Sequence, residues 1–300
     1  MYYHLFCFYG IAGSIEVVSA RSLILDIVGF KYLTIGNSIL EFVTSFLNTL
    51  GPISIAIIFA AYESTIAFIS LPILGGISVI TATLLFFSFK ESNSEINVIE
   101  ENKSKSVREG IIYAYKDINI RSLLLIASTI FFWGASQPLI PKITKDVLNS
   151  GTQVYALLIS VGGLGAMLGL ITLSLKPKIF RNSKFVAFSI CIYSLSMIIF
   201  VLSKSILLSS ILLIICGFFY SIWFTVIIIL LQTIPDADHR GRIMGLFFTV
   251  IQFYGLGFIF GGFLGDMIGI PWTIYITSLF LVFFNLIPLI VSKEYRDLKS

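Results

Sequence analysis

The chain has 300 residues, of which 57% are hydrophobic and only 12% are charged, and its formal net charge is +4. About a quarter of the residues of a soluble domain are usually charged, because charged side chains cover its surface. The composition therefore excludes an ordinary soluble protein. The basic residues are spread along the chain without an aromatic platform between them, which argues against a nucleic-acid-binding protein.

Long apolar runs follow one another along the whole chain. A run of about 20 apolar residues matches the roughly 30 Å hydrocarbon core of a bilayer, and a helix satisfies its backbone polar groups within the segment. We predict nine transmembrane helices, at about 2–24, 36–60, 65–89, 122–141, 153–175, 185–203, 206–231, 243–265 and 271–292. The predicted fold class is an all-α polytopic membrane protein.

The Lys and Arg residues lie almost entirely in alternate gaps between these runs. Only Lys142, Lys145 and Lys204 fall in the remaining gaps. Cytoplasmic loops of membrane proteins are enriched in Lys and Arg. We therefore expect the loops that hold the basic residues, and the C-terminus, to be cytoplasmic. The expected location is the cell membrane, as a multi-pass protein.

Charged residues are concentrated in one segment, 90–121. We interpret this segment as a cytoplasmic linker between two helix bundles. Residues 1–89 would be the remainder of the N-terminal bundle, with three helices, and residues 122–300 would form a C-terminal six-helix bundle. The second part of the linker, from Arg108 to Ile118, is amphipathic enough to lie on the membrane surface.

A weak internal repeat relates the two halves. Shifting the chain by 206 residues aligns Leu50-Gly51 with Leu256-Gly257, and the order of loop and helix recurs. Parallel repeats of this kind are typical of transporters. The register places the start of a complete first half about 85 residues before Met1, so we expect three helices of the pattern to be lacking from this chain.

Short charged and glycine-rich motifs stand at the ends of the predicted helices. They are Ala20-Arg21 with Leu25-Asp26, Asn37-Ser38 before Leu50-Gly51-Pro52, Glu109-Gly110 with Arg121, and Arg240-Gly241-Arg242-Ile243-Met244-Gly245 before Gly261-Gly262 and Gly265-Asp266. Together these motifs resemble the major facilitator superfamily, especially its drug and siderophore exporter branch, which includes macrolide efflux permeases and enterobactin exporters. The resemblance implies a two-bundle fold, of which this chain would hold helices 4–12 of a 12-helix pattern. The loop after Leu175 lacks the acidic residue that the family's loop motif implies, although its basic residues are present.

Few ionisable residues lie inside the predicted helices. Glu41 and Glu16 are the candidates for proton coupling, since a carboxylate in the membrane interior is costly unless it faces a partner or a functional cavity. Each residue also has a structural alternative to proton coupling. Glu41 would pair with Lys31 or a neighbouring arginine, and Glu16 would belong to a local ion-pair network. Equivalent clusters in the two halves suggest a cytoplasmic gate, for which the candidates are Arg21, Asp26, Asp236, Arg240 and Arg242.

Polar and aromatic residues within the spans are candidates for a substrate cavity, with helix-to-helix contacts as the alternative. These candidates are Asn48, Trp133, Gln137, Gln252 and Tyr254. Glycines four residues apart predict faces on which helices approach closely and across which the bundles could rock: Gly165, Gly169, Gly257, Gly261 and Gly265.

The leading hypothesis is a secondary active transporter, an exporter that exchanges protons for a hydrophobic or amphipathic small molecule by alternating access. The alternative is a truncated permease that inserts into the bilayer without transporting. An enzyme is disfavoured, because His4 and His239 are far apart and the three cysteines lie in predicted spans without metal-site spacing. We expect no cofactor, no metal, no nucleic acid and no obligate protein partner.

Overall fold

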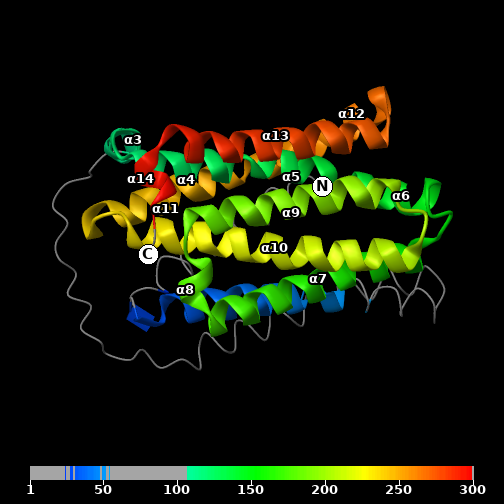
Figure 1. Ribbon diagram of the computed structural model, residues 1–300, viewed down its shortest axis with the longest axis horizontal. Coiled ribbons are helices and arrows are strands. Elements are labelled where there is room, and N and C mark those ends of the chain that lie inside the picture. The colour runs from blue at the N-terminus through cyan, green and yellow to red at the C-terminus, as the bar shows by residue number, and fades with distance from the viewer. Residues whose placement is uncertain are drawn as a thin grey trace, which may run out of the picture.

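The computed structural model describes residues 24, 28, 29, 31–47, 49–51, 54 and 107–298, and every secondary-structure element in these parts is a helix (Figure 1). Most of the predicted spans 2–24 and 65–89 lie outside the described residues. The candidate residues Glu16, Arg21, Asp26 and Asn48 lie outside them too.

The N-terminal helix comprises residues 31–47 and continues through 49–51, and it buries a narrow, mostly polar face. Leu33, Thr34, Asn37 and Ser38 are all buried and recur at helical spacing. The opposite face carries large apolar side chains such as Ile39 that the rest of the chain leaves exposed. Exposed apolar and buried polar side chains on one helix are expected where lipid surrounds the protein.

The continuous described part begins at Val107 and forms twelve helices. They are α3 (Val107–Lys116), α4 (Ile118–Ser128), α5 (Ile130–Ser136), α6 (Leu139–Asp146), α7 (Thr152–Leu175), α8 (Pro177–Phe180), α9 (Ser183–Leu202), α10 (Ile206–Thr233), α11 (Ala237–Ile251), α12 (Phe253–Ile268), α13 (Ile270–Val291) and α14 (Lys293–Arg296).

Six stretches of the described residues are long and apolar enough to cross a membrane. They are Ile118–Asp146, Thr152–Leu175, Ser183–Leu202, Ile206–Thr233, Asp238–Ile268 and Ile270–Val291. These stretches coincide with the last six predicted spans, although the first and fifth are longer than the hydropathy pattern indicates. The additional turns at the ends contain charged residues such as Lys142, Asp238 and Arg242, which lower the local hydropathy.

Two of these stretches are interrupted. The first is divided into α4, α5 and α6 at Thr129 and again at Gln137 and Pro138, and Pro138 has no backbone N–H to continue the helical hydrogen bonds. The fifth is divided into α11 and α12 at Gln252. The sequence predicts one helix for each stretch, because hydropathy does not register a local break.

Helix α10 is the central helix of this part of the chain. It packs along α7 and α9, while α12 packs against α5, and α13 against α9 and α5. Figure 1 shows α7, α9, α10 and α13 running side by side along the longest axis. Between Ser221 and Gln232 almost every side chain of α10 is buried, as expected for a helix that is apolar on all sides.

Glycines allow the closest of these helix contacts. A Cβ atom added at Gly165 would collide with the backbone carbonyl of Ile214 on α10, and one at Gly257 or Gly261 would collide with backbone carbonyls of α5. The corresponding collision at Gly169 is with α10, and that at Gly265 is with the side chain of Leu139. Close backbone approach stabilises helix pairs in lipid through van der Waals packing.

Candidate functional site

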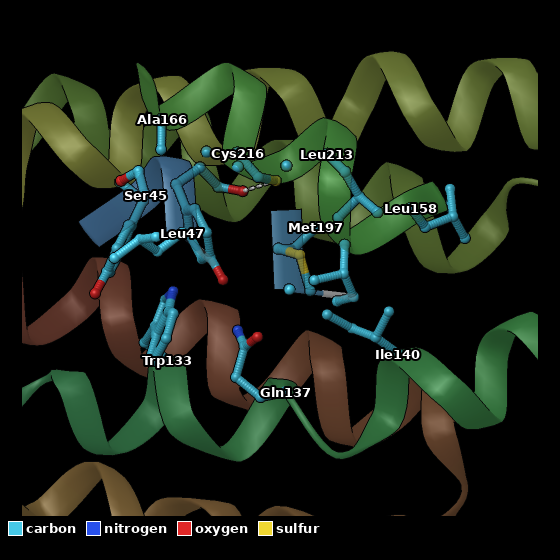
Figure 2. Close-up of a pocket in the computed structure, with 17 residues that line it drawn as sticks. Ser45, Leu47, Trp133, Gln137, Ile140, Leu158, Ala166, Met197, Leu213 and Cys216 are labelled. Carbon is cyan, nitrogen blue, oxygen red and sulfur yellow. Dashed lines mark hydrogen bonds between the residues drawn. The ribbon is translucent and has the colours of Figure 1, made fainter. Parts of the chain in front are cut away.

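A cavity of about 570 Å³ lies between the N-terminal helix and the helices that follow Val107 (Figure 2). Ser45, Leu47 and Gly51 line it from the N-terminal helix. The opposing walls come from α5, α6, α7, α9 and α10. The cavity is therefore built from both halves of the chain.

The described lining residues carry no charged side chain. Trp133, Gln137, Tyr193 and Tyr220 supply aromatic surface and hydrogen-bonding groups, and most of the remaining lining is aliphatic or glycine. Figure 2 shows the side chains of Trp133 and Gln137 pointing from their helix across the cavity toward the opposite wall. A mostly apolar cavity with a few polar groups is typical of a small-molecule site.

The Trp133 side chain is held by an aromatic stack. Its ring lies parallel to that of Tyr220, with centroids 4.7 Å apart and an interplanar angle of 15°. Tyr220 in turn stacks on Phe224 at 5.6 Å and 14°. Stacked rings restrict one another's rotamers, so this wall of the cavity is preorganised. Gln137, at the end of α5, lies one helical turn after Trp133 and therefore on the same side of the helix.

Small residues allow the helices around the cavity to converge. A Cβ atom at Gly217 on α10 would collide with the backbone of Gly162 on α7, and one at Gly163 would collide with the Thr49 side chain. Ser160 on α7 also donates a hydrogen bond to the backbone carbonyl of Thr49 at 3.2 Å. These contacts fix the N-terminal helix against α7 at one side of the cavity.

The structure separates the predicted cavity residues. Trp133 and Gln137 line the cavity. Tyr254 contacts the Trp133 ring, with centroids 6.2 Å apart, but is not a lining residue, and Gln252 lies at the junction of α11 and α12. Sequence analysis missed Ser45. Polar residues at Ser38, Glu41, Ser45 and Thr49 recur at helical spacing, and this stripe is the signal that could have indicated the lining face.

Glu41 lies one helical turn before Ser45 on this polar stripe, and its side chain is partly exposed. It is not among the described lining residues, but it interacts with other residues of the protein. The i, i+4 relationship places Glu41 and Ser45 on the same side of the N-terminal helix, about 6 Å apart along the axis.

A buried hydrogen bond joins the N-terminal helix to α10. The Asn37 side-chain amide donates to the Gln232 side-chain oxygen at 2.7 Å and to the Leu33 carbonyl at 3.1 Å. Both Asn37 and Gln232 are buried.

The gate candidates Asp236 and Arg242 contact α3. The Tyr113 hydroxyl donates a hydrogen bond to an Asp236 carboxylate oxygen at 3.3 Å and accepts one from the Asp236 backbone N–H at the same distance. Glu109 forms an ion pair with Arg242 at 3.6 Å. Burial raises the pKa of the Tyr113 hydroxyl, which keeps it protonated as a donor.

The same α3–α11 contact has an apolar component. The Tyr113 ring stacks on His239 with centroids 4.0 Å apart, and a Cβ atom at Gly110 would lie 3.0 Å from Cβ of Arg242. Arg240 lies in the first turn of α11 and also has an interaction partner. The predicted pairs with Arg21 and Asp26 fall outside the described residues.

An ion pair also joins α6 to α12, between Lys142 and Asp266. Both side chains are substantially exposed. The α3–α11 contact lies where the first and fifth membrane-spanning stretches begin. The Lys142–Asp266 pair lies where these two stretches end, at the other end of the bundle. Charged contacts therefore lie at both ends of the described helical bundle.

A family model described as the Major Facilitator Superfamily matches residues 1–256, a stretch that includes every described residue lining the cavity. A comparison with curated proteins gives no significant match. The matched stretch covers well over half of the chain, and the helices long enough to cross a membrane agree with it. The chain belongs to the Major Facilitator Superfamily and is a multi-pass membrane protein of the transporter kind.

Proposed function

We propose that the chain is a secondary active transporter of the drug and siderophore exporter branch, and that it exports hydrophobic or amphipathic small molecules by alternating access. The observation that carries this proposal is the cavity between the N-terminal helix and α5–α10. Its volume of about 570 Å³ falls within the range of small-molecule sites. Rocking of one bundle against the other would open the cavity to the other side of the membrane, where the substrate would leave.

The lining chemistry supports an amphipathic substrate. Trp133 and Tyr220 present flat aromatic surface, and Gln137 can both donate and accept hydrogen bonds. The described lining residues offer no fixed charge to pair with an ion. A molecule with an apolar or aromatic body and a few polar groups would match these walls.

Glu41 is our proposed proton-coupling residue. Its position one turn from Ser45 connects it to the cavity along the polar stripe. A carboxylate close to a cavity that opens alternately to two sides can take up a proton on one side and release it on the other. Glu16 remains the second candidate.

We further propose that the α3–α11 contact marks the cytoplasmic end of a protein of the cell membrane, with a cytoplasmic C-terminus. The gate would consist of Arg21, Asp26, Asp236, Arg240 and Arg242. The basic residues concentrated in alternate gaps support this orientation. Separation of α3 from α11 would then accompany opening toward the cytoplasm.

Transport in proteoliposomes tests the proposal. The purified chain is reconstituted with a pH gradient, and the movement of a panel of uncharged and cationic amphipathic dyes is measured. Trp133→Ala should lower the rate by about tenfold for a dye that stacks on this ring, since the lost aromatic contact amounts to about 1.4 kcal/mol. Trp272→Ala is the matched control, because Trp272 is exposed and lies outside the cavity.

Equal dye transport by parent and Trp133→Ala would contradict the cavity as the substrate site. An inserted, folded parent that moves no dye in either direction would instead favour the alternative, a permease that does not transport. Binding of the dyes to the detergent-solubilised protein separates these outcomes, because the non-transporting alternative still binds dye in the cavity. The part of the tryptophan quenching that is absent in Trp133→Ala reports this binding, since the chain has three tryptophans.

A further inference from the structure

Helix α3 presents two different faces. Gly110, Tyr113 and the buried Ala114 point toward the protein, where Gly110 and Tyr113 contact α11. The opposite face exposes three large apolar side chains, with exposed fractions of 53% for Ile111, 43% for Ile112 and 70% for Tyr115. A face of this kind is unfavourable in water and calls for an apolar environment.

Basic residues accompany the apolar side chains of this face. Arg108 and Lys116 are exposed on α3, and Arg121 is exposed in the first turn of α4. Within the described residues of this face there is no acidic side chain: Glu109 is turned toward Arg242, and the Asp117 carboxylate accepts hydrogen bonds from the first backbone N–H groups of α4. The face is therefore apolar and cationic at the same time.

The position of α3 along the chain limits what can cover this face. It ends at Lys116, and the first membrane-spanning stretch begins at Ile118. The Arg121 guanidinium lies 5.4 Å from the centre of the Tyr115 ring, and its Nη1 donates a hydrogen bond to the Tyr115 carbonyl at 3.4 Å. The exposed face of α3 is thus continuous with the outer surface of α4, at the boundary between membrane and water.

We propose that the exposed face of α3, together with Arg121, is a docking surface for anionic phospholipids of the membrane. Ile111, Ile112 and Tyr115 insert among the headgroups and upper acyl chains, as the apolar side of an interfacial helix does. Lys116 and Arg121 bind the phosphate oxygens, and Arg108 adds to the positive potential. The proposal goes beyond the transport function and does not depend on it.

A fluorescent probe on Ile112 tests the docking. Ile112→Cys is introduced into the full chain after its three native cysteines have been replaced by alanine, and the thiol is labelled with bimane. The protein is placed in nanodiscs of phosphatidylcholine alone or of phosphatidylcholine with phosphatidylglycerol, each containing lipid with a doxyl quencher near the headgroup. We expect quenching in both and about twofold stronger quenching with phosphatidylglycerol.

Charge removal shows whether the named residues are responsible. The triple variant R108Q/K116Q/R121Q should abolish the extra quenching by phosphatidylglycerol. The control K176Q/K178Q/K293Q also removes three positive charges, but from exposed positions away from α3. This control should retain the extra quenching by phosphatidylglycerol. All the substituted side chains are exposed, and size-exclusion chromatography in detergent checks that both variants are folded.

Two results would overturn the proposal. An unquenched probe in both lipid mixtures would show that the face does not reach the bilayer, and if cross-linking then found dimers, a second copy of the chain would be the occupant instead. An equal response to phosphatidylglycerol in the parent and the triple variant would show that the three basic residues do not bind the lipid headgroups.

Discussion

The side-chain amide of Asn37 donates a hydrogen bond to the side-chain oxygen of Gln232, and the two atoms are 2.7 Å apart. The residues are 195 positions apart in the chain, and both are buried between the N-terminal helix and α10. In lipid there is no water to replace a lost partner, so the bond helps to hold the two halves of the chain in this arrangement.

A double-mutant cycle measures this bond. Asn37→Ala, Gln232→Ala and the double variant should show a coupling of about 0.5 to 1.5 kcal/mol in the free energy of unfolding, measured in mixed micelles. Gln153→Ala, at an exposed position on α7, is a control that should not couple to Asn37→Ala. Additive effects of the two alanine substitutions would show that the bond contributes nothing.

Adjacent glycines on α12 provide a matched pair of substitutions. A methyl group at Gly261 would collide with the backbone of Ala135, whereas one at Gly262 meets open space. Gly261→Ala should therefore lower the free energy of unfolding by about 1 to 3 kcal/mol, since α5 and α12 must move apart. Gly262→Ala should be neutral or slightly stabilising. If the two variants unfold alike in a thermal scan in detergent, the close contact between α5 and α12 is wrong.

Glu41→Gln should abolish proton-driven transport while the protein still inserts and folds. The amide keeps the shape of the side chain but cannot exchange a proton near neutral pH. Dye transport by reconstituted parent and variant is compared over a series of pH gradients, with Glu294→Gln as a control at an exposed position outside the cavity. A rate that depends on the pH gradient as strongly in Glu41→Gln as in the parent would remove Glu41 as the coupling residue.

Tyr113→Phe should loosen α3 from α11. The variant loses both hydrogen bonds to Asp236 but keeps the stacked ring, so hydrogen exchange of the α3 backbone should speed up by about fivefold, which corresponds to about 1 kcal/mol. Unchanged exchange in α3 would mean that the Tyr113 hydroxyl does not hold the contact.

The contribution of Tyr113 also has a defined pH dependence. Burial raises its pKa above the ordinary value of 10.0, so folding favours the protonated hydroxyl. The stabilisation is fully present below that ordinary value and is lost as pH rises through the raised pKa. Thermal stability of the parent should therefore fall in strongly alkaline buffer, and part of this fall should be missing in Tyr113→Phe. Identical alkaline profiles would contradict this role.

Arg242→Ala should shift the protein toward the state open at the α3 end, because it removes the ion pair with Glu109. The Glu109 side chain is half exposed, so the shift should be modest, on the order of 1 kcal/mol or less. Thiol labelling from each side of the membrane measures it at Ser45→Cys. If the thiol at position 45 is labelled from each side at the same rate with and without Arg242→Ala, Arg242 is not part of a gate.

Hydropathy was sufficient to locate the last six membrane-spanning stretches, because a span needs only length and apolar composition. The breaks at Thr129 and Gln252 were not predictable in this way, since both positions lie within continuous apolar runs. Likewise, the amphipathic pattern of α3 predicted a membrane-surface helix but gave no indication that Tyr113 would contact Asp236. That contact joins residues 123 positions apart.

The cavity was predicted only in part. Trp133 and Gln137 stood out because large amphipathic and amide side chains are uncommon inside a membrane span. Tyr193 and Tyr220 did not, since tyrosine also serves at interfaces and in helix packing, and Ser45 is too small to be conspicuous alone. Only the arrangement of α5, α7, α9, α10 and the N-terminal helix around the cavity shows which of these residues face the same space.

The accessibility of Ser45 from the two sides of the membrane tests the substrate cavity most directly. Ser45→Cys and Val43→Cys are each introduced into a chain without other cysteines, and intact vesicles are treated with a membrane-impermeant maleimide from either side. We expect labelling of Ser45→Cys from both sides, slowed by a transported dye, and no labelling of Val43→Cys, which lies outside the cavity. Labelling of Ser45→Cys from neither side, or at a rate that no dye changes, would contradict a substrate cavity with alternating access.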